Sequence, residues 1–391
     1  MNMESIYNSL VSGDEITAKA QLKTFLKQTF ELVISDLSFQ QSEVSLNSFK
    51  GSFYSNDQKY FFKTHIEIGG EIREYAGANL LEEAGYSMIL PAFTCEDSGR
   101  ELLIYPYVED VSLFDLVKRF NEGDESVFSE DLQAAQIESD ERLFQLYQKT
   151  FEVSDSILFP DVQQLFYLRL NGQRMNLFYR GQSRVFGNES ISFERLEDLD
   201  WVVNGRALGK LKDWIELALK VLSPEEILSF SVVGHGDAHN GNVFFGDEGL
   251  RYFDPAYAGR MDPFLDLTKP LFHNAFARWM YFPEQVEAEF EVGFEIVGDR
   301  IEVSHNYKSS DMEQFFFDSK MQNVLNPLLD FLLEKEVLPV DWEARLRSSL
   351  MCCPLLTVNL FDENKYSSQM SVLGFAMVAE MASLDFNLYL K

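Results

Sequence analysis

The spacing of apolar residues changes several times along the first hundred positions, which indicates alternating helices and strands. Apolar side chains three and four positions apart predict helices, and short runs that alternate with polar residues predict strands. A Ser-Asn-Asp sequence between two alternating runs is typical of a hairpin turn. In order, the pattern predicts a helix within residues 1–35, a hairpin around residues 55–57, a helix at residues 71–85, and strands at residues 87–94 and 101–105.

The rest of the chain has mainly helical spacing, as in residues 208–222 and 370–384. The many aromatic residues within 275–391 are expected in a core rather than at a ligand site. The pattern therefore predicts an α+β protein. A part with one antiparallel sheet and one helix, residues 1–105, precedes a larger, mainly helical part, residues 106–391.

The chain is strongly acidic, because 33 Lys and Arg residues against 63 Asp and Glu residues give a net charge of −30. Such a field repels nucleic acids and anionic membrane surfaces, so neither is expected as a partner. A nucleotide is also an anion, so a phosphate site in this chain would depend on a bound metal ion and a few local cations. Residues 121–141 hold eight acidic residues and no basic one, which predicts a solvated helix face or a loop.

Three cysteines are present, Cys95 and the adjacent Cys352 and Cys353. An odd, sparse set of this kind is typical of a reducing compartment, and all three are expected as small buried hydrophobic residues. The N-terminus lacks the basic and apolar segments of a secretory signal, and no run of about 18 apolar residues occurs. The sequence therefore predicts a cytoplasmic protein.

Residues 231–266 hold the most informative pattern, with polar residues in a glycine-containing loop between apolar runs. The runs predict a buried strand, the polar loop and then a hairpin of two strands. This hairpin would bring Asn242 and Asp254 back beside Asp237. Mg²⁺ takes one or two carboxylates plus phosphate and water oxygens, so two of these side chains suit a magnesium site. The remaining carboxylate can orient an attacking hydroxyl, as phosphoryl transfer requires.

His235 and His239 flank Asp237, and imidazole with carboxylate also suits a transition metal such as zinc or iron in a hydrolase. A histidine pair four residues apart converges best on a helix, however. The three glycines within residues 234–241 disfavour a helix there. We therefore expect structural roles for both histidines.

The sequence HGDAHNGN at residues 235–242, followed by Phe-Asp-Pro, resembles the catalytic and metal-binding signature of the aminoglycoside phosphotransferase and choline kinase superfamily. That family has a protein-kinase-like fold, so the resemblance implies two lobes: a small antiparallel-sheet N-lobe with one helix and a larger, mainly helical C-lobe. It implies Asp237 as catalytic base, Asn242 and Asp254 as magnesium ligands, and Asp266 as a buried acid that braces the catalytic loop. The resemblance extends over about residues 39–274.

The resemblance also implies a lysine for the nucleotide phosphates and a helical glutamate that pairs with it. Lys63, in the apolar run YFFKTH, and Glu74, in the following helix, are the candidates, with Glu71 as the alternative to Glu74. The segment LIYPYV resembles the family's hinge, where main-chain groups read the adenine edge. Tyr105 and Tyr107 are therefore expected beside the adenine.

The loop over the phosphates is expected at residues 47–53. Protein kinases place several glycines there, whereas this loop offers only Gly51 as an obviously permissive residue. Backbone N–H groups of Ser48, Gly51 and Ser52 are the expected phosphate contacts. The low glycine content departs from the family pattern.

Residues 166–184 hold Arg169, Arg174, Arg180 and Arg184 with no acidic residue among them, which is unusual in so acidic a chain. These side chains can bind a phosphate or carboxylate of the acceptor, as arginine forks do, or they can pair with the acidic segment described above. An acidic pocket for an aminated sugar is a further option. The sequence leaves the acceptor open.

The sequence thus predicts a magnesium-dependent enzyme that moves the γ-phosphate of ATP or GTP to a hydroxyl of a small molecule, such as a sugar, amino sugar, aminoglycoside or amino alcohol. The alternative is a kinase-like module that binds nucleotide or regulates partners without catalysis, which the glycine-poor loop favours. The presence of Asp237, Asn242 and Asp254 together argues against that alternative. Transfer of a nucleotidyl group through the same fold is a third option.

Overall fold

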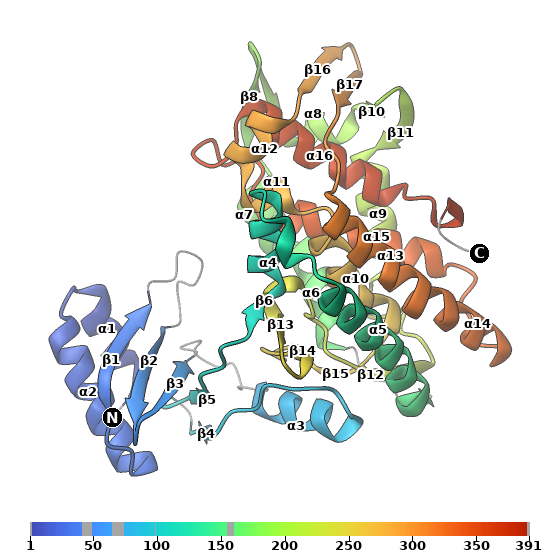
Figure 1. Ribbon diagram of the computed structural model, residues 1–391. Helices are drawn as coiled ribbons and strands as arrows, with labels where there is room; N and C mark the ends of the chain where they lie inside the picture. Colours follow the sequence, from blue (N-terminus) through green and yellow to red (C-terminus); the bar gives the residue numbers. More distant parts are fainter. Residues whose placement is uncertain (1, 41–48, 65–73, 98, 155–159, 389–391) are drawn as a thin grey trace.

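The computed structural model describes residues 2–40, 49–64, 74–97, 99–154 and 160–388. Figure 1 shows a small N-terminal group of strands and helices beside a larger, mainly helical group. This is the α+β, two-part architecture that the sequence predicted. None of the helices in these ranges combines the length and apolarity needed to cross a membrane.

A five-stranded antiparallel sheet forms the small group, with the strand order β1-β2-β3-β5-β4. Its strands are β1 Ser35–Gln40, β2 Lys50–Ser55, β3 Gln58–Lys63, β4 Phe93–Cys95 and β5 Leu102–Pro106. The β2–β3 hairpin lies where it was predicted, and its turn residues Asn56 and Asp57 have φ of 49° and 63°. Positive φ at both central positions is what a two-residue hairpin turn of type I′ requires. Strand β1 was not predicted, because helical spacing was assigned up to residue 35.

Two helices, α1 Met3–Val11 and α2 Glu15–Phe30, replace the single leading helix that was predicted. Gly13 between them has a φ of 81°, and the Asp14 carboxylate caps α2 by accepting from the Thr17 N–H. Apolar residues of both helices pack on the sheet in one buried cluster. Its members include Met3, Ile6, Leu22, Phe25, Phe53 and Phe62.

Helix α3, Glu74–Ala84, corresponds to the helix predicted at residues 71–85. Its buried Leu81 belongs to the large C-terminal core, which shows that α3 packs on the larger group. Gly77 faces the larger group so closely that a Cβ would lie 2.6 Å from the Pro255 carbonyl oxygen. The segment after α3 continues this attachment, since the Ile89 N–H donates to the Tyr252 carbonyl at 2.8 Å.

The larger group is built from helices α4 to α16. They are α4 Leu113–Asn121, α5 Glu130–Thr150, α6 Asp161–Leu170, α7 Gln173–Phe178, α8 Phe193–Asp198, α9 Leu211–Val221, α10 Pro263–His273, α11 Arg278–Tyr281, α12 Pro283–Glu289, α13 Asp311–Lys320, α14 Asn326–Glu334, α15 Trp342–Thr357 and α16 Ser368–Ala382. Cys352 and Cys353 are buried in α15 and Cys95 in β4, as the sequence predicted.

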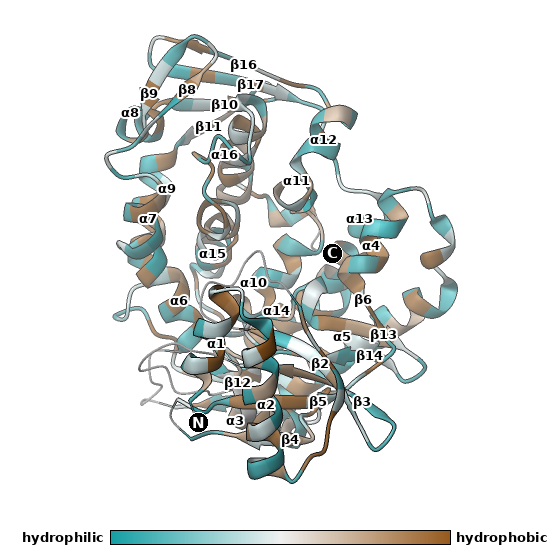
Figure 2. Ribbon diagram, turned by 90° about the vertical axis from the view of Figure 1, so that its left-hand side faces the viewer, coloured by the Kyte–Doolittle hydropathy of each residue, from teal (hydrophilic) through white to brown (hydrophobic). Residues whose placement is uncertain are grey.

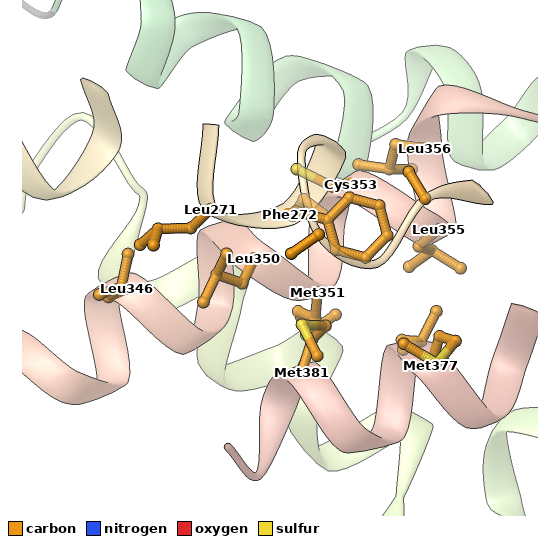
Figure 3. Packing of buried hydrophobic residues seen from close by; sticks show 14 of the residues in the cluster. Leu271, Phe272, Leu346, Leu350, Met351, Cys353, Leu355, Leu356, Met377 and Met381 are labelled. Atoms are coloured by element: carbon orange, nitrogen blue, oxygen red, sulfur yellow. The ribbon is translucent and has the colours of Figure 1, made fainter. Parts of the chain in front are cut away.

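Helix α10 is the centre of this group, since its residues from Pro263 to Phe272 are all buried. Figure 3 shows Leu271 and Phe272 of α10 against Leu350 of α15, with Met377 and Met381 of α16 on the opposite side of α15. A helix that is buried on every side is a rigid element, so polar side chains on α10 are held in fixed positions. Two such side chains, Asp266 and Lys269, reach the candidate site.

The acidic segment at residues 121–141 lies mostly in α5, and most of its carboxylates are exposed, as expected for a solvated helix face. Asp140 is the exception. It is fully buried and forms an ion pair with Lys320 of α13, and it also accepts hydrogen bonds from Gln136 and Ser319.

A second sheet lies at the far end of the larger group (Figure 2) and was not predicted. Its four strands, in the order β11-β10-β17-β16, are β10 Asp200–Val203, β11 Arg206–Lys210, β16 Val292–Val297 and β17 Arg300–His305. The pair β8 Ser183–Phe186 and β9 Glu189–Ser192 lies nearby. Two three-stranded sheets frame the candidate site. They are made of β7 Glu152–Val153, β12 Phe230–Gly234 and β15 Gly259–Met261, and of β6 Val111–Ser112, β13 Val243–Gly246 and β14 Gly249–Tyr252.

Candidate active site

The loop that follows β12 is fixed by glycines and by Asp266. Gly236 has a φ of 74°, and a Cβ there would lie 2.7 Å from the Tyr257 carbonyl oxygen, so glycine is required. Its N–H donates to Asp266 Oδ1 at 2.6 Å, and the Tyr147 hydroxyl donates to Asp266 Oδ2 at 2.6 Å. A Cβ on Gly234 would lie 2.6 Å from the same Oδ2. The buried carboxylate thus holds the loop from α10, in the position that the resemblance implied.

Asp237 follows directly and points toward a lysine. Its Oδ1 lies 2.6 Å from Lys269 Nζ and 3.6 Å from His239 Nε2. The Asp237 side chain is 18% exposed and that of Lys269 10%. Burial lowers the pKa of His239, so the lysine rather than the histidine supplies the positive charge beside this carboxylate.

Lys269 was missed by the sequence reasoning. A signal was available, because Lys269 lies three residues after Asp266 and therefore on the same face of a helix. Its Nζ also lies 4.7 Å from the centre of the Tyr257 ring, a cation–π distance. The pairing itself is a tertiary contact that spacing cannot show.

Asn242 and Asp254 lie at the two ends of the predicted hairpin, as expected. Asn242 Nδ2 donates to the Asp237 carbonyl at 3.0 Å, and the Phe253 N–H donates to the Asn242 carbonyl at 2.8 Å. The side chain of Asn242 is therefore oriented by Asp237, with its amide oxygen left as an acceptor. Asp254 has a φ of 59° and a partly exposed carboxylate. A neutral amide oxygen and one carboxylate, with room for phosphate and water oxygens, fit Mg²⁺.

Lys63 joins the two parts of the molecule at this point. It ends β3 in the small group, is 8% exposed, and places Nζ 2.7 Å from Asp254 Oδ1 in the larger group. A lysine so deeply buried needs a charged partner, and here the partner is the candidate metal ligand itself. The predicted phosphate-binding cation and the predicted metal ligand are thus neighbours.

His235 ties the loop of Asp237 to the residues before Asp254. Its Nδ1 accepts from the Asp237 N–H at 3.3 Å, and its Nε2 donates to the Phe253 carbonyl at 3.1 Å. Burial lowers the pKa of His235, which keeps the ring neutral as this pair of bonds requires. With both ring nitrogens engaged, His235 is not available to a metal. Within the described residues, no three His, Cys, Asp or Glu side chains converge on a metal position.

The predicted phosphate loop at residues 47–53 was wrong from position 50 on, where the chain is strand β2. Gly51 is paired with Phe39 of β1 and Phe62 of β3, and a Cβ there would lie 2.1 Å from the Ser38 carbonyl oxygen. Close strand packing therefore explains this glycine. Ser52 lies in the same strand, and its phosphate contact stays a prediction.

Several other predicted contacts to the nucleotide stay untested. Ser48 and Glu71 lie outside the described residues, and Glu74 is the first residue of α3 with its side chain outside the description. Tyr105 is 2% exposed and its ring centre lies 4.8 Å from that of Phe253, so its side chain is part of the core. Tyr107 is 42% exposed. Its N–H donates to the Lys59 carbonyl at 3.0 Å, so a hinge contact to adenine must come from other main-chain groups.

The four arginines do not pair with residues 121–141 in the described structure, so that interpretation was wrong. Arg180 forms an ion pair with Glu197 at 2.6 Å, and Arg184 is buried and donates to main-chain carbonyls of residues 360 and 366. Arg174 donates to the carbonyls of residues 356 and 357, where α15 ends. Arg169 lies on α6, close enough to Asp237 to interact with it electrostatically.

Comparison with solved structures identifies the fold. Spectinomycin phosphotransferase APH(9)-Ia, solved with ADP and spectinomycin, is 14% identical and matches with a TM-score of 0.50 over 93% of this chain and 97% of its own. A thermostable mutant of aminoglycoside phosphotransferase APH(4)-Ia, solved with AMP-PNP and hygromycin B, is 11% identical, also with a TM-score of 0.50, over 93% and 99% of the two chains.

This chain has the fold of an aminoglycoside phosphotransferase. A further structure of APH(4)-Ia gives the same TM-score of 0.50 at 10% identity, over 92% of this chain and 98% of the other. No protein-family model matches the sequence, and no curated protein matches it. At such identities the aminoglycoside phosphotransferase fold is established by shape, and the chemistry has to be argued from the residues of this chain.

Proposed function

We propose that this protein is a small-molecule kinase that transfers the γ-phosphate of a nucleoside triphosphate to an alcohol hydroxyl. One observation carries the proposal: Lys63, from the small group, meets Asp254 at 2.7 Å, and Asn242 is bonded to Asp237 in the adjoining loop. A phosphate-binding cation, two metal ligands and a base are the parts that this reaction uses. Two of the three solved structures in the fold comparison contain ADP or AMP-PNP, which supports a nucleotide donor.

Each residue has a separate role in the proposed reaction. Asp237 orients the acceptor hydroxyl and takes its proton as the oxygen attacks the γ-phosphorus and the bond to the leaving β-phosphate oxygen breaks. Lys63 binds phosphate oxygens and neutralises their charge. Asn242 and Asp254 would hold Mg²⁺, which supplies further charge neutralisation on the phosphates when bound. Asp266 and His235 act indirectly, by holding the loop that carries Asp237.

A thermal-shift titration with ATP and GTP, with and without Mg²⁺, tests the nucleotide site first. A ligand at 100 times its Kd raises the stability of the folded state by about 2.7 kcal/mol. We expect a magnesium-dependent rise in Tm that is lost in Asp254→Ala. Asp247→Asn, an exposed carboxylate in the β13–β14 turn, is the matched control and should behave as wild type.

Turnover is then measured as ADP release with a panel of alcohols. Asp237→Asn should abolish turnover and keep the nucleotide-dependent rise in Tm, because a base acts in the transition state. Full turnover in Asp237→Asn would refute the catalytic assignment. Magnesium-dependent nucleotide binding with no turnover on any acceptor would favour the non-catalytic module, and release of diphosphate instead of ADP would indicate nucleotidyl transfer.

A further inference from the structure

Helix α10 contacts the candidate catalytic loop at two successive residues. Asp266 Oδ1 accepts the N–H of Gly236 at 2.6 Å, and Lys269 Nζ lies 2.6 Å from Oδ1 of Asp237. Three residues of a helix span about 4.5 Å along its axis, close to the roughly 3.8 Å between neighbouring Cα atoms of the loop. One helix therefore fixes both the main chain before Asp237 and the Asp237 side chain.

The ammonium group of Lys269 has little freedom to move. The helix around it is buried at every position from 263 to 272, and the Lys269 side chain is 10% exposed. Its Nζ lies 4.7 Å from the centre of the Tyr257 ring, an arrangement that attracts a cation. A closely packed side chain keeps one rotamer, so Lys269 can hold its partner in one orientation.

The two oxygens of the Asp237 carboxylate have different surroundings. Oδ1 is buried, whereas the side chain as a whole is 18% exposed, so its exposed part is not this oxygen. The closest approaches of Lys269 and His239 to the carboxylate are both made to Oδ1, at 2.6 Å and 3.6 Å. Oδ2 is therefore the oxygen that remains for a hydroxyl of the acceptor.

His239 does not replace Lys269 as the group that holds Oδ1. A separation of 3.6 Å from His239 Nε2 is beyond hydrogen-bond distance. The other ring nitrogen, Nδ1, accepts from the Gly241 N–H at 3.0 Å, so the ring is already oriented by its own loop. Burial also lowers the pKa of His239, which keeps the ring neutral.

The two other carboxylates of the candidate site have partners of their own. Asp254 lies 2.7 Å from Lys63, and Asp266 accepts the Tyr147 hydroxyl as well as the main-chain N–H described above. Neither carboxylate has a hydrogen bond or ion pair with Lys269 within the described residues. The ion pair that Lys269 forms in this part of the structure is thus with the candidate base.

We propose that Lys269 is a positioning residue for the candidate base: it holds Oδ1 of Asp237 so that Oδ2 faces the acceptor hydroxyl. This role rests on the proposed function, because a base is needed only if a hydroxyl is phosphorylated. A general base contributes about 100-fold to 10,000-fold to a rate, and a displacement of about 1 Å in an active site can cost about 100-fold. Loss of the lysine should therefore lower kcat and leave nucleotide binding intact.

The test measures turnover as ADP release, with the acceptor of the panel that gives the fastest reaction. Lys269→Met should lower kcat about 100-fold while the KM for ATP stays close to that of wild type. Lys269→Arg keeps the charge on a larger, planar group and should lie between. Lys269→Ala leaves space for a small amine, so added propylammonium should restore part of kcat in a saturable manner. Lys212→Met, which alters an exposed pair with Asp198, is the matched control.

Urea denaturation of the same proteins tests the ion pair without using turnover. Lys269→Met leaves the Asp237 carboxylate without its cation and should lower the urea midpoint, and the double change with Asp237→Asn should recover part of the loss. A double variant that is no more stable than Lys269→Met overturns the pairing. Where Lys269→Met does not fold, the comparison of Lys269→Arg with wild type decides in the same way.

The pattern of kcat, KM and rescue decides the role of Lys269. A fall in kcat alone that propylammonium partly reverses in Lys269→Ala, but not in Asp237→Asn, supports the proposal. An unchanged kcat in Lys269→Met overturns it, and so does a joint loss of kcat and nucleotide binding without rescue, because the lysine is then only structural. Wild type is measured first, so an absence of turnover on every acceptor refutes the proposed function, and this role with it, before any variant is compared.

Discussion

Asp266 offers the sharpest test of how the candidate catalytic loop is held. The carboxylate is 3% exposed and accepts the Gly236 N–H and the Tyr147 hydroxyl, each at 2.6 Å. A hydrogen bond to a charged group contributes about 1.5–3 kcal/mol, so Asp266→Ala removes roughly 3–6 kcal/mol. Since whole domains are stable by about 5–15 kcal/mol, this is a large fraction of the total.

Urea denaturation of two matched variants separates the contributions. Tyr147→Phe removes one of the two bonds and should cost about 1.5–3 kcal/mol. Asp266→Asn keeps an acceptor for the Gly236 N–H and a donor for the Tyr147 oxygen, so it should cost less than Asp266→Ala. If Asp266→Ala lies within about 1 kcal/mol of wild type, or equals Tyr147→Phe, the carboxylate does not brace the loop in the way described.

Three further predictions concern packing, buried charge and pH. Gly234→Ala should cost about 1–3 kcal/mol in urea denaturation, because its Cβ would lie 2.6 Å from Asp266 Oδ2, whereas Gly259→Ala, with open space around it, should be neutral. Asp140→Ala should cost about 3–5 kcal/mol because Lys320 stays buried without its partner, and the double change Asp140→Leu with Lys320→Met should recover most of it; equal stabilities would contradict this. Burial lowers the pKa of His235, His239 and His273, so the unfolded chain binds more protons than the folded protein below about pH 6.5. The free energy of unfolding should therefore fall on acidification, by up to about 1.4 kcal/mol per pH unit for each histidine. His273→Gln should make this fall less steep between pH 7.5 and 5.5, and an unchanged pH dependence would refute the effect assigned to His273.

The local fold of the candidate site was predictable because the relevant pattern is local, whereas the roles of its residues stay predictions. The strand, loop and hairpin over residues 229–254 follow from short-range spacing, and the hairpin geometry alone brings Asn242 and Asp254 near Asp237. The Lys269 contact was not predictable in this way, since it depends on how α10 packs under the loop. The sequence identifies Arg169 as a candidate anion-binding residue, but its surroundings depend on how α6 packs in the folded protein.

The second sheet was missed for a different reason. Its strands β10 and β11 have four and five residues, too few for an alternating pattern to stand out from helical spacing. Strands β16 and β17 have six residues each and do alternate in burial, but they lie in the part of the chain whose spacing was interpreted as mainly helical. The break between α1 and α2 was missed because Gly13 lies inside a region where apolar residues recur at helical spacing on both sides. The division of the chain at residue 105 stays a prediction.

The attachment of α3 bears on how the nucleotide cleft can open. Chain order assigns α3 to the small group, yet Gly77 contacts Pro255, and Ile89 is bonded to Tyr252. We therefore expect α3 to move with the catalytic loops as one rigid body. The moving part would then be the five-stranded sheet with α1 and α2, which carries Lys63 toward or away from Asp254. If the two parts separate in this way, Lys63 moves while α3, Asp254 and the catalytic loop keep their positions relative to one another.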